Sequence, residues 1–267
     1  MDAIPPPPAI RRLGQNFLVD PNIVRKIVAL AELSASDSVL EIGPGRGILT
    51  EALSRAAGHV TAIEIDPRLH TFLSERAEHL PNVALVLGDA LTAPIEHLPM
   101  GTIVVANLPY YISTPLLFRL LSHGNRFVRL VLMMQNEVAD RLIAKPGTSE
   151  YGVLSVMAQY SAQISKAFKV SPKCFRPRPE VDSAVVLLRV HEPRARGPQE
   201  ERQFTALVRA AFAHRRKTLV NSLKNEGYDA KHVEAVLTRL RLSPSLRAET
   251  LALEQFLELA HHLADPA

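Results

Sequence analysis

The sequence lacks most of the features by which secreted, membrane-spanning and metal-binding proteins are recognised. Cys174 is the only cysteine among 267 residues, which excludes an internal disulfide and a zinc site made of thiolates. The ten histidines show no metal-ligand spacing, so we expect no metal. No apolar run approaches the roughly 18 to 20 residues of a membrane-spanning helix, and prolines occupy the N-terminus where a signal peptide would be apolar. These absences favour a cytoplasmic protein without a membrane partner.

The composition, with 47% hydrophobic and 22% charged residues, is that of an ordinary globular protein. Its positive charge is unevenly distributed. Residues 160–224 carry fourteen Lys or Arg against five Asp or Glu, whereas the rest of the chain has an excess of acidic residues. Such a segment could face the phosphates of a nucleic acid, but charged runs are also common on solvated surfaces, so charge alone leaves both interpretations open.

The sequence patterns divide the chain into three parts. Residues 1–12 contain four consecutive prolines and are expected to form a disordered tail. Residues 13–190 alternate short apolar strands with helices, which predicts an α/β domain with a mostly parallel, Rossmann-like sheet. Residues 191–199 are typical of a linker, and helical periodicity over the remainder of 191–267 predicts a smaller all-α domain.

Seven strands are predicted in the α/β part. Their ranges are 39–42, 60–64, 83–87, 103–106, 128–133, 163–170 and 183–190. The connection between the last two is too short for a crossover helix, so we expect an antiparallel pair at the edge of the sheet. Before the first strand, Asp20 and Pro21 predict the N-cap and first residue of a short amphipathic helix.

A glycine-rich turn, Gly43-Pro44-Gly45-Arg46-Gly47, follows the first of these strands and precedes a helix. Glycines let the backbone approach a ligand closely and leave helix amides directed at it. A dinucleotide-binding loop would have its third glycine five positions after the first, where this chain has Ile48. The spacing therefore argues against a dehydrogenase, although a turn without any ligand is also compatible with it.

Two acidic residues end the next two strands. Glu64 lies 21 residues after Gly43, where a carboxylate can accept both hydroxyls of a ribose. Asp89 follows the third strand and could accept a hydrogen bond from an adenine amino group. Either residue alone would more often be a turn or cap residue. Because open parallel sheets bind ligands beyond their carboxyl ends, the pair predicts an adenosine-like ligand without a pyrophosphate.

The sequence Asn107-Leu108-Pro109-Tyr110 ends the fourth strand and suggests chemistry on an amine. The exocyclic nitrogen of adenine is a poor nucleophile, because its lone pair is delocalised into the ring. Acceptance of both amino protons, by the Asn107 side-chain oxygen and a backbone carbonyl near Leu108 or Pro109, would favour a pyramidal nitrogen. Tyr110 offers a face for base stacking. A plain Asn-Pro loop with a core tyrosine is the alternative.

The segment between the two edge strands offers a second aromatic ring. Two prolines stiffen it, so Phe175 could cover the other face of a flipped-out base while Arg176 and Arg178 contact phosphates. Considered alone, Phe175 would more often be a core residue.

Together these motifs resemble the ribosomal RNA adenine dimethyltransferases of the KsgA type, from about Leu13 to the C-terminus. Gly14-Gln15-Asn16-Phe17-Leu18 resembles the family's entry motif, and residues 212–223 resemble the opening of its helical C-terminal domain. By this resemblance Tyr110 and Phe175 would hold the target adenine. The cofactor contacts that the resemblance and the motifs predict are Asn16, Leu18, Gly43, Gly45, Glu64, Asp89 and Asn107.

The resemblance implies a class I methyltransferase fold with S-adenosylmethionine as methyl donor. It implies direct transfer of two methyl groups to each of two adjacent adenines, in the hairpin loop near the 3′ end of small-subunit rRNA. The expected partner is an immature 30S-type ribosomal particle, and we expect a monomer. The predicted RNA contacts are Arg176, Arg178, Arg215, Arg216 and Lys217.

Two alternatives remain open. A sister enzyme that methylates one adenine of large-subunit rRNA would share every cofactor motif, and the segment 214–223 favours the small-subunit branch. A ribosome-assembly or transcription factor could keep the fold without catalysis, but a pure binder has no use for the acceptors of residues 107–110.

Overall fold

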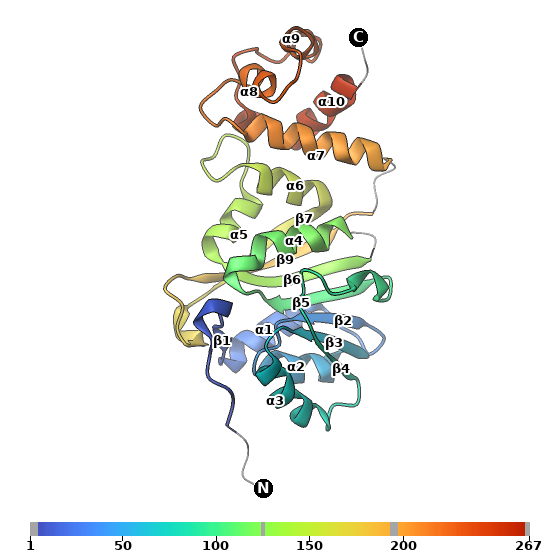
Figure 1. Cartoon of the computed structure of the whole chain (residues 1–267), viewed down its shortest axis with the longest axis vertical. Coiled ribbons are helices and arrows are strands. Elements are labelled where there is room, and N and C mark those ends of the chain that lie inside the picture. The colour runs from blue at the N-terminus through green and yellow to red at the C-terminus, as the bar shows by residue number, and fades with distance from the viewer. Residues whose placement is uncertain (1–4, 124–125, 193–196, 265–267) are drawn as a thin grey trace. The chain divides into compact units, whose positions relative to one another are not determined.

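The computed structural model describes residues 5–123, 126–192 and 197–264. The chain forms two compact units (Figure 1). The first comprises residues 1–139 and 162–192, and the second comprises residues 140–161 and 193–267. Each unit is described separately below.

A seven-stranded sheet forms the centre of the first unit. Its spatial order is β4-β3-β2-β5-β6-β9-β7, which Figure 1 shows as adjacent arrows. The five strands from β4 to β6 are parallel, β9 is antiparallel to β6, and β7 is antiparallel to β9. The strands are β2 (Ser38–Ile42), β3 (His59–Glu64), β4 (Val83–Leu87), β5 (Thr102–Asn107), β6 (Phe127–Gln135), β7 (Ala162–Val170) and β9 (Ser183–Val190).

Helices cover both faces of this sheet, as its strands, apolar on both sides, require. The helices of this part are α1 (Pro21–Ala31), α2 (Ile48–Ala56), α3 (Pro67–Ala77), α4 (Ser113–Ser122) and α5 (Asn136–Ile143), the last of which continues into the second unit. Buried side chains of α1 and α2 pack with one face of the sheet, among them Ile27 and Leu53. Helix α2 connects β2 to β3, toward one edge of the sheet, whereas α4 connects β5 to β6, toward the other edge. Because both connections are right-handed, α4 lies on the opposite face of the sheet from α2.

The sequence predictions for the sheet are confirmed. All seven strands are present, and the structure extends several of them by one to three residues. The last two pair antiparallel at the edge, with β9 on the inner side between β6 and β7. The predicted helix begins at Pro21, and the Asp20 side chain accepts a hydrogen bond from the amide of Asn22 at 2.8 Å.

A separate two-stranded sheet joins two distant segments. Strands β1 (Phe17–Leu18) and β8 (Phe175–Arg176) pair antiparallel, with Leu18 opposite Phe175. The entry motif and the segment between the edge strands therefore lie side by side.

The second unit is helical. It contains α6 (Val153–Ser161), α7 (Pro198–Phe212), α8 (Leu219–Asn225), α9 (Ala230–Arg239) and α10 (Leu253–Ala264). Short 3-10 helices occur throughout the chain at η1 (Arg11–Leu13), η2 (Ile95–His97), η3 (Tyr110–Ile112), η4 (Pro172–Cys174) and η5 (Ala248–Thr250). The core of the second unit is built around Phe204 and Phe256, which are both fully buried.

The domain boundaries differ from the sequence prediction, which placed all of residues 13–190 in one domain. Residues 140–161 group with the C-terminal helices. Side-chain packing explains this: the Tyr151 hydroxyl donates a hydrogen bond to the Leu251 carbonyl at 2.9 Å, and the Tyr160 ring lies 4.5 Å from that of Phe204.

The predicted linker is also shorter than expected. Helix α7 already begins at Pro198, so residues 198 and 199 are helical rather than part of the 191–199 linker. Residues 193–196 of the predicted linker lie outside the described residues.

Replacement of Phe204 tests whether α6 belongs to the helical unit. We expect Phe204→Ala to destabilise that unit by about 3 to 5 kcal/mol, because it leaves a large cavity in the core. Amide hydrogen exchange should then accelerate in residues 140–161 as well as in α7 to α10. The matched variant Leu40→Ala, in the centre of the sheet, should accelerate exchange in β2 and its neighbours instead. Unchanged exchange in residues 140–161 of Phe204→Ala would contradict the grouping.

Candidate active site

A cavity opens at the carboxyl edge of the sheet, beside β2, where the strand order reverses. It holds about 690 Å³ of empty space including its open mouth. This is where open parallel sheets bind ligands. Nine of the predicted site residues line it: Asn16, Gly43, Gly45, Glu64, Asp89, Asn107, Leu108, Pro109 and Tyr110. The cavity is formed entirely within the first unit.

The glycine-rich turn lies close to an aromatic ring. Gly43, Gly45 and Gly47 have φ values of 66°, 60° and 85°, a region that other residues rarely adopt. A Cβ on Gly45 would lie 2.9 Å from Cδ1 of Phe17, so the turn has no space for a side chain there. Helix α2 begins directly after this turn, at Ile48.

Glu64 is held by two backbone amides. Its Oε2 accepts a hydrogen bond from Gly45 at 3.1 Å, and its Oε1 accepts one from Asp66 at 2.9 Å. Burial raises the pKa of Glu64, and these amides oppose the rise. Because a carboxylate oxygen can accept two hydrogen bonds, each oxygen retains capacity for one more donor. That arrangement suits a pair of neighbouring hydroxyls.

Two carboxyl groups near Glu64, those of Glu41 and Asp66, interact with it electrostatically. Burial raises the pKa of Glu41 to about 8, so this side chain is mostly uncharged at neutral pH. The nearby Asp66 is ionised, because its hydrogen bonds from Arg68 hold its pKa at about 2. Asp66 and Arg68 form an ion pair at 2.7 Å, so the positive charge of Arg68 offsets the negative charge of Asp66.

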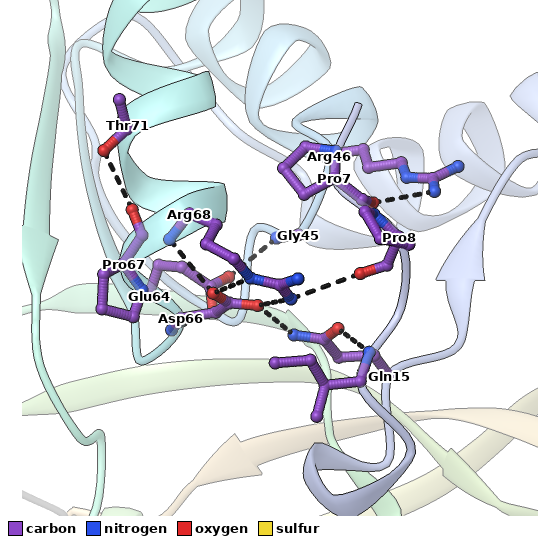
Figure 2. A network of polar contacts seen from close by, with 11 residues as sticks. Pro7, Pro8, Gln15, Gly45, Arg46, Glu64, Asp66, Pro67, Arg68 and Thr71 are labelled. Atoms are coloured by element: carbon purple, nitrogen blue, oxygen red, sulfur yellow. Dashed lines mark hydrogen bonds and ion pairs between the residues drawn. The ribbon is translucent and has the colours of Figure 1, made fainter. Parts of the chain in front are cut away.

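A polar network fastens the N-terminal segment beside this carboxylate, as Figure 2 shows. The Gln15 side chain donates to Asp66 at 3.0 Å, and the Pro8 carbonyl accepts a hydrogen bond from Arg68 at 3.2 Å. The carbonyl of Pro7 accepts one from Arg46 at 3.1 Å. The expectation of a disordered tail over residues 1–12 is therefore wrong for this part of it, because these carbonyls are anchored to side chains near the cavity. Residues 1–4 of the predicted tail lie outside the described residues.

The sequence analysis did not predict this network, although one of its residues, Asp66, lies in a recognisable helix-capping pattern. Asp66 followed by Pro67 repeats the N-cap pattern of Asp20 and Pro21, and Asp66 does cap α3. Its bond with Gln15 joins residues 51 positions apart, which no local pattern indicates. Ile65 and Tyr111, both well exposed, also line the cavity and were not predicted.

Asp89 uses one carboxylate oxygen in a turn. Its Oδ1 accepts a hydrogen bond from the Leu91 amide at 2.8 Å. Among the described residues its Oδ2 has no hydrogen-bond partner. Asp89 therefore acts as a turn residue and still keeps an acceptor for a ligand.

Asn107 has an oriented side-chain amide. Its Nδ2 donates a hydrogen bond to the Asn16 carbonyl at 3.1 Å, so its Oδ1 is the group left to accept. The amide of Leu108 donates to the Met133 carbonyl at 2.9 Å, which holds the turn against β6. Asn107 therefore lines the cavity, and its Oδ1 has no hydrogen-bond partner among the described residues.

Tyr110 is anchored at both ends. Its hydroxyl shares a 2.6 Å hydrogen bond with the hydroxyl of Ser183, and the Ser113 hydroxyl donates to its backbone carbonyl at 3.1 Å. Burial raises the pKa of Tyr110, so it remains a neutral phenol.

Phe175 does not match its expected role in this structure. Its ring is fully buried in the core and does not line the cavity, because β8 pairs with β1 and apolar neighbours surround it. The stacking role predicted for Phe175 is therefore corrected to a core role here. Leu18 is likewise a buried core side chain, so any cofactor contact that it makes would use its backbone.

The five predicted RNA-contacting cations are exposed, two in the first unit and three in the second. Arg176 donates to the Phe175 carbonyl at 2.8 Å, and Arg215 donates to the Ser149 carbonyl at 3.0 Å. Arg178, Arg216 and Lys217 also lie on the surface.

Two further observations concern the described part of the chain. No group of three or more His, Cys, Asp or Glu residues is arranged there to hold a metal ion. None of its helices combines the length and apolar character that a membrane crossing requires.

Comparison with known proteins adds to this geometry. The fold and the nucleoside-sized cavity at the strand ends are those of a class I methyltransferase. Residues 9–265 match the family model for ribosomal RNA adenine dimethylase. The chain therefore belongs to the ribosomal RNA adenine dimethylase family, and it is an S-adenosylmethionine-dependent rRNA adenine dimethyltransferase. This finding confirms the predicted family, fold class and enzyme class, and it contradicts the dehydrogenase alternative.

Several relatives are similar over most or all of their length. The ribosomal RNA small subunit methyltransferase A of Ligilactobacillus salivarius is 45% identical, over 95% of this chain and 89% of its own. That of Moorella thermoacetica is 44% identical, over 94% and 91%. Among solved structures, a dimethyladenosine transferase from Plasmodium falciparum has a TM-score of 0.81 at 31% identity, over 91% of this chain and 95% of its own. The 23S rRNA methyltransferase ErmE has a TM-score of 0.73 at 30% identity, over 94% and 100%.

Substitution of Gly45 tests the glycine-rich turn. We expect Gly45→Ala to weaken S-adenosylmethionine binding by about tenfold or more in calorimetry. The added Cβ would clash with the Phe17 ring, and an alanine is strained at the positive φ of this position. Gly101→Ala is the matched control, since Gly101 has a φ of 81° but open space around it. It should lose some stability and keep its affinity. Equal affinities of the two variants would contradict a close ligand approach at Gly45.

Proposed function

We propose that this enzyme dimethylates the amino groups of two adjacent adenines, in the hairpin loop near the 3′ end of small-subunit rRNA. Its substrate would be an immature small ribosomal subunit. The oriented Asn107 amide in the cavity is the observation that carries this proposal, because its Oδ1 is placed to accept an amino proton. The similarity to proteins named ribosomal RNA small subunit methyltransferase A, at 41% to 45% identity, supports the choice of substrate.

The residues around the cavity fit the methyl donor. S-adenosylmethionine, when bound, supplies a methyl group made electrophilic by a positively charged sulfur. The free acceptor capacity of Glu64 fits its ribose hydroxyls, and Oδ2 of Asp89 fits its adenine amino group. Because Gly45 carries no side chain, its backbone can lie close to the donor. No metal is needed in this scheme.

Asn107 and its neighbours prepare the target amine. Its Oδ1 and a backbone carbonyl of the turn at residues 107–109 would accept the two amino protons. With both protons held, the nitrogen is pyramidal and its lone pair is free of the ring. The Tyr110 ring would hold the base by stacking. These preorganised groups act by positioning and polar stabilisation, so no covalent intermediate with the protein is required.

Large-subunit methylation is the second candidate, and the similarity to the 23S enzyme ErmE is the observation in its favour. Transfer of labelled methyl groups to purified small and large subunits distinguishes the two. We expect label in small subunits isolated from cells that lack this protein, and N6,N6-dimethyladenosine in their digested rRNA. Label only in large subunits, or only monomethylated product, would overturn the proposal.

Replacement of Asn107 tests the chemistry. We expect Asn107→Ala to lower kcat by about 10²-fold or more, because a preorganised acceptor is lost, while RNA binding stays largely intact. Asn82→Ala is the matched control: the Asn82 amide also donates to backbone carbonyls, at 2.8 and 3.0 Å, but lies outside the cavity lining. Methyl transfer is measured with labelled donor. Full activity of Asn107→Ala would remove the proposed role.

Neutralisation of Arg215, Arg216 and Lys217 tests the RNA contacts of the helical unit. If all three contact phosphates, the triple Gln variant should bind rRNA more weakly, and the slope of log K against log salt should fall by about 2 to 3. The matched control replaces three other exposed cations with Gln: Arg55, Lys231 and Arg239. Filter binding over a salt series gives both slopes. Equal slopes for the two triple variants would show that Arg215, Arg216 and Lys217 do not contact RNA phosphates.

A further inference from the structure

Ser183 is brought to the active edge of the sheet by an antiparallel register. It begins β9 and lies opposite Gln135 at the end of β6 and opposite Val170 at the end of β7. The start of β9 is thus level with the carboxyl ends of the parallel strands. Ser183 is fully buried, and strands on both sides hold its backbone.

The Ser183 side chain contacts one residue of the site. Its hydroxyl is 2.6 Å from the hydroxyl of Tyr110, and either group can be the donor. The other end of Tyr110 is held by Ser113 through the backbone carbonyl. Without the Ser183 contact, the ring plane of Tyr110 would be set only by packing, since the terminal torsion of an aromatic side chain has a broad minimum.

We propose that Ser183 is a positioning residue for the target adenine, which it controls by fixing the Tyr110 ring. This inference rests on the proposed function, in which Tyr110 stacks on the base. Ser183 does not line the cavity itself, so it acts only through the ring.

The same contact ties the ring to a surface loop. Ser183 directly follows the segment 177–182, which carries the exposed Arg178. One hydrogen bond therefore joins the loop expected to contact RNA phosphates to the ring expected to hold the base. A base presented by correctly bound RNA then meets a ring whose orientation depends on that loop.

The test uses the full chain and small subunits that lack the modification. We expect Ser183→Ala to lower kcat by about three- to tenfold, the usual range for loss of one hydrogen bond. Calorimetry should give an unchanged Kd for S-adenosylmethionine, because the cofactor-facing residues are untouched. Tyr110→Phe keeps the ring and removes the same hydrogen bond, so it should reproduce the loss.

The double variant separates positioning from general stability. If Ser183 acts through the Tyr110 hydroxyl, Ser183→Ala with Tyr110→Phe should lose no more activity than either single variant. Thr102→Val is the matched control, since it removes a buried hydroxyl that donates to the Pro99 carbonyl at 2.7 Å at the opposite end of the sheet. Its kcat should be unchanged.

Three results would overturn the inference. They are a wild-type kcat in either single variant, multiplied losses in the double variant, and an equal loss in Thr102→Val. Should Ser183→Ala fail to fold, Tyr110→Phe alone still decides, because it leaves Ser183 in place. An inactive wild-type enzyme on small subunits would instead refute the proposed function, which keeps the two failures distinct.

Discussion

The alignment of strand ends at one edge of the sheet is the constraint on which the site depends. Four residues of the site each follow or end a different parallel strand: Gly43, Glu64, Asp89 and Asn107. The parallel pairing of β4 with β3, β3 with β2 and β2 with β5 brings all four residues to one cavity. Residues far apart in the chain become neighbours without any long-range pairing of their side chains. The antiparallel β9 extends this edge, since its first residue, not its last, lies there. A shift of one residue in any of these strands would turn its side chains to the other face.

The N-terminal segment supplies the part of the site that the sheet cannot. The Asn16 carbonyl accepts a hydrogen bond from Nδ2 of Asn107, and Phe17 covers Gly45. This segment therefore leaves Oδ1 of Asn107 as the group available to accept. It is fastened in two ways: β1 pairs with β8, and Gln15 bonds Asp66. The anchoring of Pro7 and Pro8 to Arg46 and Arg68 extends the same attachment along the chain (Figure 2). The orientation of the Asn107 amide therefore depends on tertiary contacts.

Local patterns predicted what depends on local physics. The strands, the Asp20 cap and the glycine-rich turn all follow from apolar runs, capping chemistry and φ preferences, and each was predicted from residues close in the sequence. The misses depend on distant partners. Phe175 was expected at the base, but it is buried in the core beside the β1 pairing. Residues 140–161 pack with helices that begin only at Pro198. The acceptor role of the motif at residues 107–110 stays a prediction, whereas Ser183, which hydrogen-bonds to Tyr110, carries no signal in its own neighbourhood.

The titratable groups of the cavity bear on how the amine loses its proton. Among the described residues that line it, those groups are Glu64, Asp89, Tyr110 and Tyr111, and none is a histidine, lysine or cysteine. Glu64 is occupied by two amides, and burial raises the pKa of Tyr110, so that its hydroxyl is no base near neutral pH. The free Oδ2 of Asp89 is assigned above to the adenine of the methyl donor, so the proposed scheme leaves no cavity carboxylate to remove a proton from the target amine. Such a site suits an amine that attacks while still carrying both protons and releases one only after its nitrogen has become positively charged and strongly acidic.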